Sequence, residues 1–214
     1  MKKIGIIGSG IVARTLGNGF LSHNYEVMLG TRDSNKLLDW KNAGGVNAHI
    51  GTFQEAAKFG EIIVLAVKGN VAAEAIEMAG PQNLQWKTVI DTTNPIAPAP
   101  PENGVLRFFT NFEESLMELL QTRFPEIHFV KAFNCVGSAH MVHPVFAEKP
   151  TMFTCGNNVH SKEETHGILT EFGWDVADMG KDTAARAIEP LCMLWCIPGM
   201  MHGTWNHAFR LMKG

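Results

Sequence analysis

A glycine-rich turn near the N-terminus constrains the fold more than any other feature of the sequence. The apolar run Lys3–Ile7 is followed at once by Gly8, Ser9, Gly10, Ile11, Val12 and Ala13, in the spacing G-x-G-x-x-A. The turn ends a predicted strand and opens a predicted helix within a unit of about 30 residues, which is the context that the dinucleotide-binding fingerprint requires. Gly8 permits the tight turn, Gly10 lets a diphosphate approach the backbone, and Ala13 lets the helix pack on the strand. We therefore expect Gly8–Val12 to bind a dinucleotide diphosphate at the helix N-terminus.

The residues after the second predicted strand favour NADP over NAD. Proteins that bind NAD usually carry Asp or Glu about 20 residues beyond the glycine turn, where the carboxylate bonds the ribose 2′-OH. Here that position is Gly30, followed by Thr31 and Arg32, so no carboxylate stands there to repel a 2′-phosphate. We expect the Thr31 hydroxyl, the Arg32 guanidinium and Lys36 to bind that phosphate. Asp33 is the acidic neighbour, and we expect it to face solvent or to cap the next turn.

Strands and helices alternate along the chain, which predicts an α/β fold with a doubly wound, mainly parallel Rossmann sheet. The near-continuous apolar run Glu61–Val67 is typical of a central parallel strand buried on both faces. The predicted strands are residues 3–7, 25–29, 46–50, 61–67, 88–91, 127–133, 151–155 and 174–177. Later predicted helices are residues 34–41, 52–59, 71–79, 110–123 and 161–172, and two of them begin with capping boxes, Thr52-x-x-Glu55 and Thr110-x-x-Glu113.

We expect two parts in the chain. Residues 1–180 form the predicted NADP-binding Rossmann domain, and residues 181–214 form a short helical segment interrupted near Pro190 and Pro198. The stretch Leu191–Met201 is apolar on nearly all sides, and a helix of that kind is normally buried. It predicts either the contact of a twofold homodimer or one wall of an acceptor site, where Met and Trp suit a flat aromatic ring.

Composition narrows the classes of function. The formal charge is −3 and no basic stripe is visible, so we expect no nucleic-acid partner. No stretch approaches the ~20 apolar residues of a membrane span, so none is expected. Four cysteines without paired spacing are typical of reduced thiols, which predicts a cytoplasmic protein. The helical spacings of Cys192, Cys196, His202 and His207 are unlike the converging ligands of structural zinc, so we predict no metal site.

In doubly wound sheets, ligands bind beyond the carboxyl ends of the strands. The fourth predicted strand ends in Ala66, Val67 and Lys68, which we expect to line the diphosphate and the riboses. The segments after the fifth and sixth strands should surround the nicotinamide, where an asparagine amide can bond the carboxamide or an acceptor ring; they supply Asn94, Pro95 and Asn134. The alternative for each asparagine is a turn residue that bonds its own backbone.

Four motifs occur in order along the chain: GSGIVA, LGTR, DTTNP and VKAFN. On these motifs the chain resembles the NADP-dependent oxidoreductases that reduce the deazaflavin coenzyme F420, and it is even more similar to the cytosolic reductase domain of the six-transmembrane ferric reductases. The resemblance covers about residues 2–190. It implies hydride transfer between NADPH and a flavin or deazaflavin held face to face, with the acceptor either a small molecule or carried by a partner protein. By position it also implies a nicotinamide flanked by Val67, Asn94, Pro95 and Asn134.

Other acceptors would place a different demand on the protein. A carbonyl or imine substrate usually needs a general acid, whereas a flavin takes the hydride on a ring atom. The chain has no Tyr-x-x-x-Lys pair, and its single tyrosine is Tyr25. His140 and His143, on the loop after VKAFN, are the candidate acids, and they keep a small imine or carbonyl reductase as an alternative. A further alternative is an NADP-binding redox sensor or scaffold without turnover.

Overall fold

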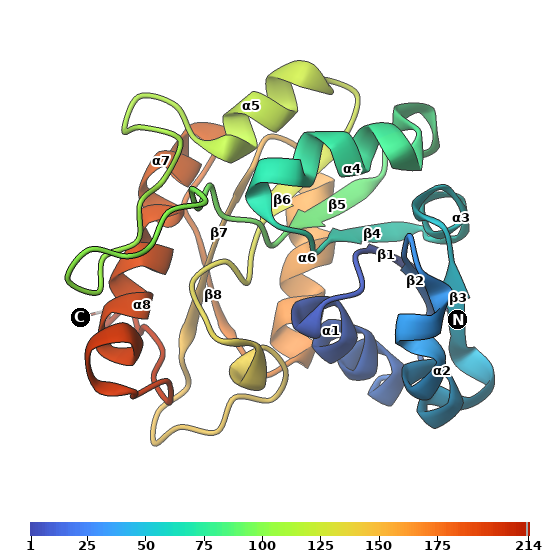
Figure 1. The fold of residues 1–214 in the computed structure, drawn as a ribbon, viewed down its shortest axis with the longest axis horizontal. Coiled ribbons are helices and arrows are strands. Elements are labelled where there is room, and N and C mark those ends of the chain that lie inside the picture. The colour runs from blue at the N-terminus through green and yellow to red at the C-terminus, as the bar shows by residue number, and fades with distance from the viewer. Residues whose placement is uncertain (213) are drawn as a thin grey trace.

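Eight short apolar segments form one sheet in the computed structural model, which describes residues 1–212 and 214 (Figure 1). The order across the sheet is β3-β2-β1-β4-β5-β6-β7-β8. Strands β1 to β6 pair in parallel, β7 is antiparallel to β6, and β8 is parallel to β7. The predicted doubly wound, mainly parallel α/β sheet is confirmed. The strands are β1 (Lys3–Ile7), β2 (Glu26–Gly30), β3 (Ala48–Gly51), β4 (Ile62–Leu65), β5 (Thr88–Asp91), β6 (His128–Lys131), β7 (Thr151–Gly156) and β8 (Asp175–Asp178).

Helices cover both faces of the sheet, so the core has two layers. In β4, Ile62 and Val64 pack in one core cluster and Ile63 and Leu65 in the other. This burial on both faces explains why the strand reads as a continuous apolar run. One layer holds α1 (Ile11–Ser22), α2 (Leu38–Gly44) and α6 (Val159–Glu171), and the other holds α3 (Phe53–Phe59), α4 (Ala72–Ala79) and α5 (Leu116–Arg123).

The two predicted capping boxes have different outcomes. Thr52 and Glu55 cap α3 as predicted. The helix predicted from Thr110 is wrong at its start, because α5 begins at Leu116 behind a box made by Ser115 and Glu118. Thr110 instead belongs to a loop. The two patterns lie one residue apart in sequence. The later one starts the helix because buried apolar residues, Leu116, Met117 and Leu120, begin there.

Between β5 and α5 the chain forms a projecting segment, residues 96–112, which we call the arm. The arm forms an irregular hairpin. Ile96 lies opposite Phe108 at its base, and Glu102 lies opposite Val105 beside its tip. Asn103 and Gly104 at its tip have φ values of 51° and 81°, which suit a two-residue hairpin turn. The proline-rich stretch is therefore an ordered element that lies against α8 (Pro190–His202), since Gly104 packs on Met201.

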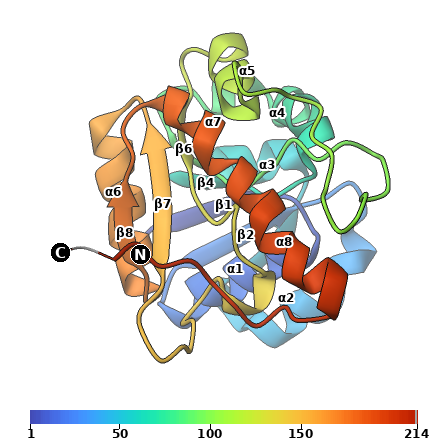
Figure 2. The same ribbon diagram turned by 90° about the vertical axis from the view of Figure 1, so that its left-hand side faces the viewer.

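The C-terminal segment differs from its prediction. After α7 (Ala185–Ile188), α8 continues through Pro198 and ends at Gly203, whose φ is +70°. The predicted helix beyond that point is wrong, because the chain turns back and runs beside β7 (Figure 2). There the Thr151 amide donates to the Phe209 carbonyl oxygen at 2.9 Å. These contacts are distant in sequence, so helical periodicity could not predict them.

The C-terminal helices are not separated from the sheet. Ala185 and Ile188 of α7 pack in the same core cluster as α3, α4 and α5. The division of the chain at residue 180 into an NADP-binding part and a C-terminal part therefore stays a prediction about their functions. No helix in residues 1–212 is long and apolar enough to cross a membrane.

Candidate active site

The glycine turn joins β1 to α1 and leaves an open approach to the helix. Gly8 has φ +144°, and a Cβ there would lie 2.2 Å from the Ala66 carbonyl oxygen, so this position requires glycine. Gly10 has an ordinary φ of −76°, and a Cβ there would meet no described atom within 4 Å. No side chain of the described residues caps the N-terminus of α1. Its free N–H groups and this open space fit an anionic diphosphate.

The end of β2 carries the predicted phosphate-binding residues. Arg32 and Lys36 are exposed, as a ligand contact requires. The Thr31 hydroxyl instead donates to the Asp33 carbonyl oxygen at 3.1 Å, which leaves Arg32 as the more available donor. Asp33 caps the next turn, as expected, by accepting from the Asn35 amide at 3.1 Å. Its other carboxylate oxygen lies 3.8 Å from Lys36 Nζ, so Lys36 partly neutralises the one acidic neighbour.

The segment after β4 brings the predicted strand-end residues together. Ala66 packs against Gly8, its amide donates to the Ile7 carbonyl oxygen at 2.9 Å, and Lys68 is exposed two residues later. A Cβ on Gly69 would lie 2.0 Å from the Asn94 carbonyl oxygen, so only glycine lets these loops approach so closely. Val67 is half-buried between these two contacts.

Asn94 and Asn134 form a reciprocal pair at the carboxyl ends of β5 and β6. Asn94 Nδ2 donates to the Asn134 carbonyl oxygen at 2.7 Å, and Asn134 Nδ2 donates to Asn94 Oδ1 at 3.2 Å. Asn134 Nδ2 also donates to the Ile188 carbonyl oxygen at 2.9 Å. Both partners of that nitrogen are acceptors, which settles the orientation of the amide. The bonds run between segments 40 residues apart, so neither asparagine is merely a local turn residue.

One polar atom of this pair has no hydrogen-bond partner. Asn134 is 3% exposed, and its Oδ1 makes neither a hydrogen bond nor an ion pair. It is the one buried side-chain nitrogen or oxygen atom among residues 1–212 of which this is true. A buried acceptor without a donor costs about 1–3 kcal/mol, so such an atom calls for an explanation. A ligand N–H group, such as that of a carboxamide, would satisfy it. Pro95 is buried beside the pair.

The two histidines lie in different surroundings. His143 Nε2 lies 2.9 Å from His23 Nε2, directly after the C-terminal end of α1. A helix of 12 residues spans about 18 Å, so His143 stands far from the glycine turn at the other end of α1. His140 is half-buried and its ring lies 4.9 Å from that of Phe146.

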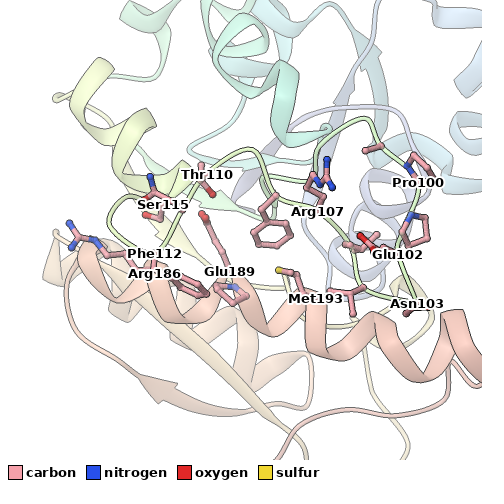
Figure 3. Close-up of a pocket in the computed structure, with 17 residues that line it drawn as sticks. Pro100, Glu102, Asn103, Arg107, Thr110, Phe112, Ser115, Arg186, Glu189 and Met193 are labelled. Carbon is pink, nitrogen blue, oxygen red and sulfur yellow. The ribbon is translucent and has the colours of Figure 1, made fainter.

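A cavity of about 820 Å³ lies between the arm and the C-terminal helices. Figure 3 shows the arm arching over α8, with Glu189 and Met193 rising from the helices toward it. Leu106 and Phe108 from the arm contribute to its mainly apolar wall. None of the predicted cofactor residues lines it. Sequence reasoning missed this cavity because the arm and α8 are brought together only by the fold.

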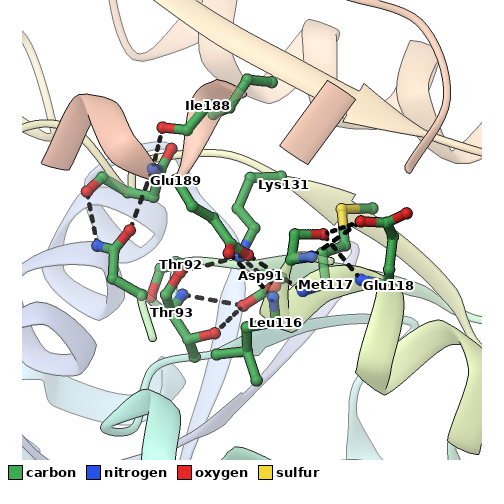
Figure 4. A network of polar contacts seen from close by, with 12 residues as sticks. Asp91, Thr92, Thr93, Leu116, Met117, Glu118, Lys131, Ile188 and Glu189 are labelled. Carbon is green, nitrogen blue, oxygen red and sulfur yellow. Dashed lines mark hydrogen bonds and ion pairs between the residues drawn. The ribbon is translucent and has the colours of Figure 1, made fainter. Parts of the chain in front are cut away.

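A buried ion network was also missed. Lys131 of the VKAFN motif lies between Asp91 and Glu189, and none of the three is more than 1% exposed (Figure 4). Burial opposes the charge of Lys131, but the two carboxylates outweigh it and raise the pKa of the ammonium above its ordinary value. The sequence did carry a signal for this network, because Asp91 and Lys131 are charged residues at the ends of two apolar strands.

The four C-terminal cysteine and histidine residues show other contacts. Cys192 and Cys196 are buried free thiols, and His207 stacks on Trp195 with ring centroids 4.9 Å apart. In the part of the chain that the structure describes, no group of three or more metal-ligating side chains converges.

Comparisons of sequence and fold show which known proteins the chain resembles. Residues 3–95 match the family described as NADP oxidoreductase coenzyme F420-dependent. The chain is 28% identical over 207 residues to metalloreductase STEAP3 of Rattus norvegicus, which covers 93% of this chain and 39% of that protein. The chain thus spans about two fifths of the length of this curated relative.

Solved structures extend the likeness over the whole chain. A protein of Arthrobacter sp. FB24, provisionally described as an F420-dependent NADP reductase, superposes with a TM-score of 0.91 at 29% identity, covering 100% of both chains. An imine reductase of Streptomyces aurantiacus has a TM-score of 0.70 at 16% identity, covering 94% of this chain and 63% of that one, which shows the fold alone. The resemblance to both families named from the sequence is confirmed, and it relates the chain to NADP-dependent oxidoreductases.

Proposed function

We propose that this relative of NADP-dependent oxidoreductases transfers a hydride between NADPH and a flavin or deazaflavin stacked on the nicotinamide. The observation that carries the proposal is the Asn94–Asn134 pair at the carboxyl ends of adjacent strands, with one buried acceptor unsatisfied. Ligands of doubly wound sheets bind at this edge.

The residues present fit NADP(H). Gly8, Ser9, Gly10, Ile11 and Val12 would hold the diphosphate, since the space above Gly10 is open and α1 begins there without a side-chain cap. Arg32 would bind the 2′-phosphate, with Thr31 and Lys36 beside it. Ala66, Val67 and Lys68 would line the riboses. Asn94, Pro95 and Asn134 would flank the nicotinamide, and Asn134 Oδ1 would accept a hydrogen bond from its carboxamide.

The cavity under the arm supports a flat, largely apolar acceptor. Its volume of about 820 Å³ lies in the range of small-molecule sites. Phe108 and Met193 provide surfaces that suit an aromatic ring. The cavity adjoins the asparagine pair, because Ile188 bonds Asn134 and the next residue, Glu189, lines the cavity.

The chain's own contribution to the reaction would be mainly positional. Bound NADPH would supply the hydride. Holding donor and acceptor in near-attack geometry can lower a barrier by about 7–11 kcal/mol. The asparagine pair would fix the orientation of the nicotinamide, and the wall of α8 would exclude water from its face. A flavin ring needs no protonated carbonyl, so no side-chain acid is required beside the ring.

The direct test is NADPH oxidation by the purified protein under anaerobic conditions. FMN, FAD and a deazaflavin are supplied one at a time, and NADH replaces NADPH as the control. We expect turnover with at least one acceptor and much slower turnover with NADH. Tight NADPH binding without turnover on any acceptor would instead favour the alternative of a redox sensor or scaffold.

The alternative of a small imine or carbonyl reductase has its own test. His140→Ala and His143→Ala should each leave flavin reduction within about twofold of the parent rate, because neither ring is needed as an acid. A steep loss of turnover for His140→Ala, with a carbonyl or imine as substrate, would support that reductase.

Three further expectations belong to this proposal. Four buried free thiols support a cytoplasmic location, since cysteines in reducing compartments stay unpaired. The acceptor is taken to be a small molecule or one carried by a protein partner. A second copy of the chain is the other expected partner.

A further inference from the structure

The buried network of Figure 4 joins four elements at the candidate active site. Lys131 Nζ lies 2.7 Å from Asp91 Oδ2 and 2.9 Å from Glu189 Oε1, and its third donor bond reaches the Thr93 carbonyl oxygen at 2.9 Å. All three ammonium hydrogens are thereby used. Asp91 Oδ1 accepts from the Thr93 amide at 2.9 Å and the Thr93 hydroxyl at 2.7 Å. The network thus reaches Thr93, the residue directly before Asn94 in sequence.

Glu189 connects this network to the helices that line the cavity. Its Oε2 accepts from the Leu116 amide at 2.9 Å and its Oε1 from the Met117 amide at 3.0 Å, so it satisfies the first turn of α5. The residue itself stands between α7 and α8. One buried carboxylate therefore ties α5, β6 and the C-terminal helices to each other.

The neighbouring residue carries the connection to the nicotinamide position. The Ile188 carbonyl oxygen accepts from Asn134 Nδ2 at 2.9 Å, and Asn94 Oδ1 accepts from the same nitrogen at 3.2 Å. Because Glu189 anchors the chain one residue away, it determines where the Ile188 carbonyl stands. The direction of Asn134 Oδ1 follows from the two bonds of its nitrogen.

Stability alone gives no sufficient reason for such a network. Replacing a buried ion network by packed apolar side chains is often neutral or stabilising, because the charges must be removed from water. What the charges do supply is fixed geometry, since each bond has a direction and a length. We propose that Glu189 is a positioning residue that holds Asn134 in register for the nicotinamide. This inference rests on the proposed function, because it takes that function's nicotinamide position as given.

The test separates the nicotinamide from the rest of the cofactor. Dissociation constants are measured for NADPH and for 2′-phospho-ADP-ribose, which lacks the nicotinamide, in the parent protein and in Glu189→Gln. The dissociation constant of 2′-phospho-ADP-ribose divided by that of NADPH is a ratio that reports the contribution of the nicotinamide to binding. In Glu189→Gln we expect the ratio to fall at least fivefold toward one, while 2′-phospho-ADP-ribose binds within about twofold of the parent.

Glu118→Ala is the matched control for a general loss of stability. It removes a cap of α5 and the ion pair with Arg186, but Glu118 takes no part in the hydrogen bonds that join Asn134 to Asn94 and to Ile188. We expect it to lower the melting temperature and keep the parental ratio. If Glu189→Gln also keeps that ratio, or weakens both ligands equally, the positioning role is refuted.

Two further measurements keep the outcome decisive. Should Glu189→Gln fail to fold, the triple variant Asp91→Asn, Lys131→Met, Glu189→Gln is measured instead, because it removes the buried ammonium together with both carboxylates that pair with it. The same fall in the ratio is expected, and an unchanged ratio refutes the role. A ratio near one in the parent protein would refute the nicotinamide position itself, which is a failure of the proposed function.

Discussion

At the scale of single residues, we expect the choice between NADP and NAD to depend on Arg32. The Thr31 hydroxyl is used within its own turn, so we propose the exposed guanidinium as the principal donor to a 2′-phosphate. Arg32→Ala should weaken NADPH binding by about 1.5–3 kcal/mol, or roughly 10- to 150-fold, and leave NADH within about twofold. Calorimetry with both dinucleotides measures this. Arg210→Ala, which breaks a pair with Glu148, is the control. Equal losses for both dinucleotides would contradict the assignment.

The two glycines of the turn should respond differently to the same substitution. Gly10→Ala adds a methyl group to open space at an ordinary φ, so the free energy of unfolding should change by about 1 kcal/mol or less. It should nevertheless weaken NADPH at least tenfold, because the methyl occupies the diphosphate approach. Gly8→Ala should cost at least about 2 kcal/mol of stability, through its positive φ and the clash with Ala66. Urea unfolding and calorimetry distinguish the two, and parental NADPH binding by Gly10→Ala would exclude this turn as the diphosphate site.

At the scale of elements, the start of α5 depends on a carboxylate. Ser115 Oγ accepts from the Glu118 amide at 3.1 Å, and Glu118 Oε2 accepts from the Ser115 amide at 2.9 Å. Arg186 binds the same carboxylate through Nε at 3.0 Å and Nη2 at 2.6 Å. Partial burial opposes the charge, but the bonds from Arg186 and Ser115 outweigh it and hold the pKa of Glu118 below its ordinary value.

This lowered pKa predicts an acid-dependent contribution to stability. The contribution is complete above the ordinary glutamate pKa of about 4.3 and is lost as the pH falls below it through the lowered value. Glu118 is half-buried and its partner Arg186 is exposed, so Glu118→Gln should cost only about 0.5–1 kcal/mol at pH 7, and this cost should shrink as the pH falls through the lowered pKa. Urea unfolding at several pH values checks this, with Glu74→Gln as the control. A constant difference between Glu118→Gln and the parent across that range would be inconsistent with the predicted shift.

At the scale of the whole molecule, α8 is only half covered. Cys192, Trp195, Cys196 and Gly199 are buried, whereas Leu194, Met200 and Met201 are exposed. The helix was predicted to be buried all round, and we expect a second copy to cover the remaining face. Light scattering after size exclusion should show a dimer, and Leu194→Glu with Met201→Glu should show a monomer that still binds NADPH. Val46→Glu, at an exposed site elsewhere, should remain dimeric; a monomeric parent protein would refute the interface.

The comparison of sequence and structure separates local from long-range physics. The glycine turn, the order of strands and helices and the cap of α3 follow from interactions within about one turn or one strand, so the sequence predicts them directly. Strand ends were less exact, since β4 and β6 have four residues each where longer strands were predicted. The start of α5 was misjudged because two capping patterns lie one residue apart and burial selected the second. The tail beyond Gly203 was misjudged because its bonds reach β7, about 60 residues away.

The sequence by itself determined the class of the sheet, the glycine turn between β1 and α1 and the identity of the asparagines at the strand ends, because periodicity and backbone sterics act over short distances. The tertiary structure alone decided that these two asparagines bond each other, that Lys131 and Glu189 form an ion pair, and that the arm encloses a cavity with α8. Those features join segments that are distant along the chain. Only the closed fold brings their charges and amides within hydrogen-bonding distance.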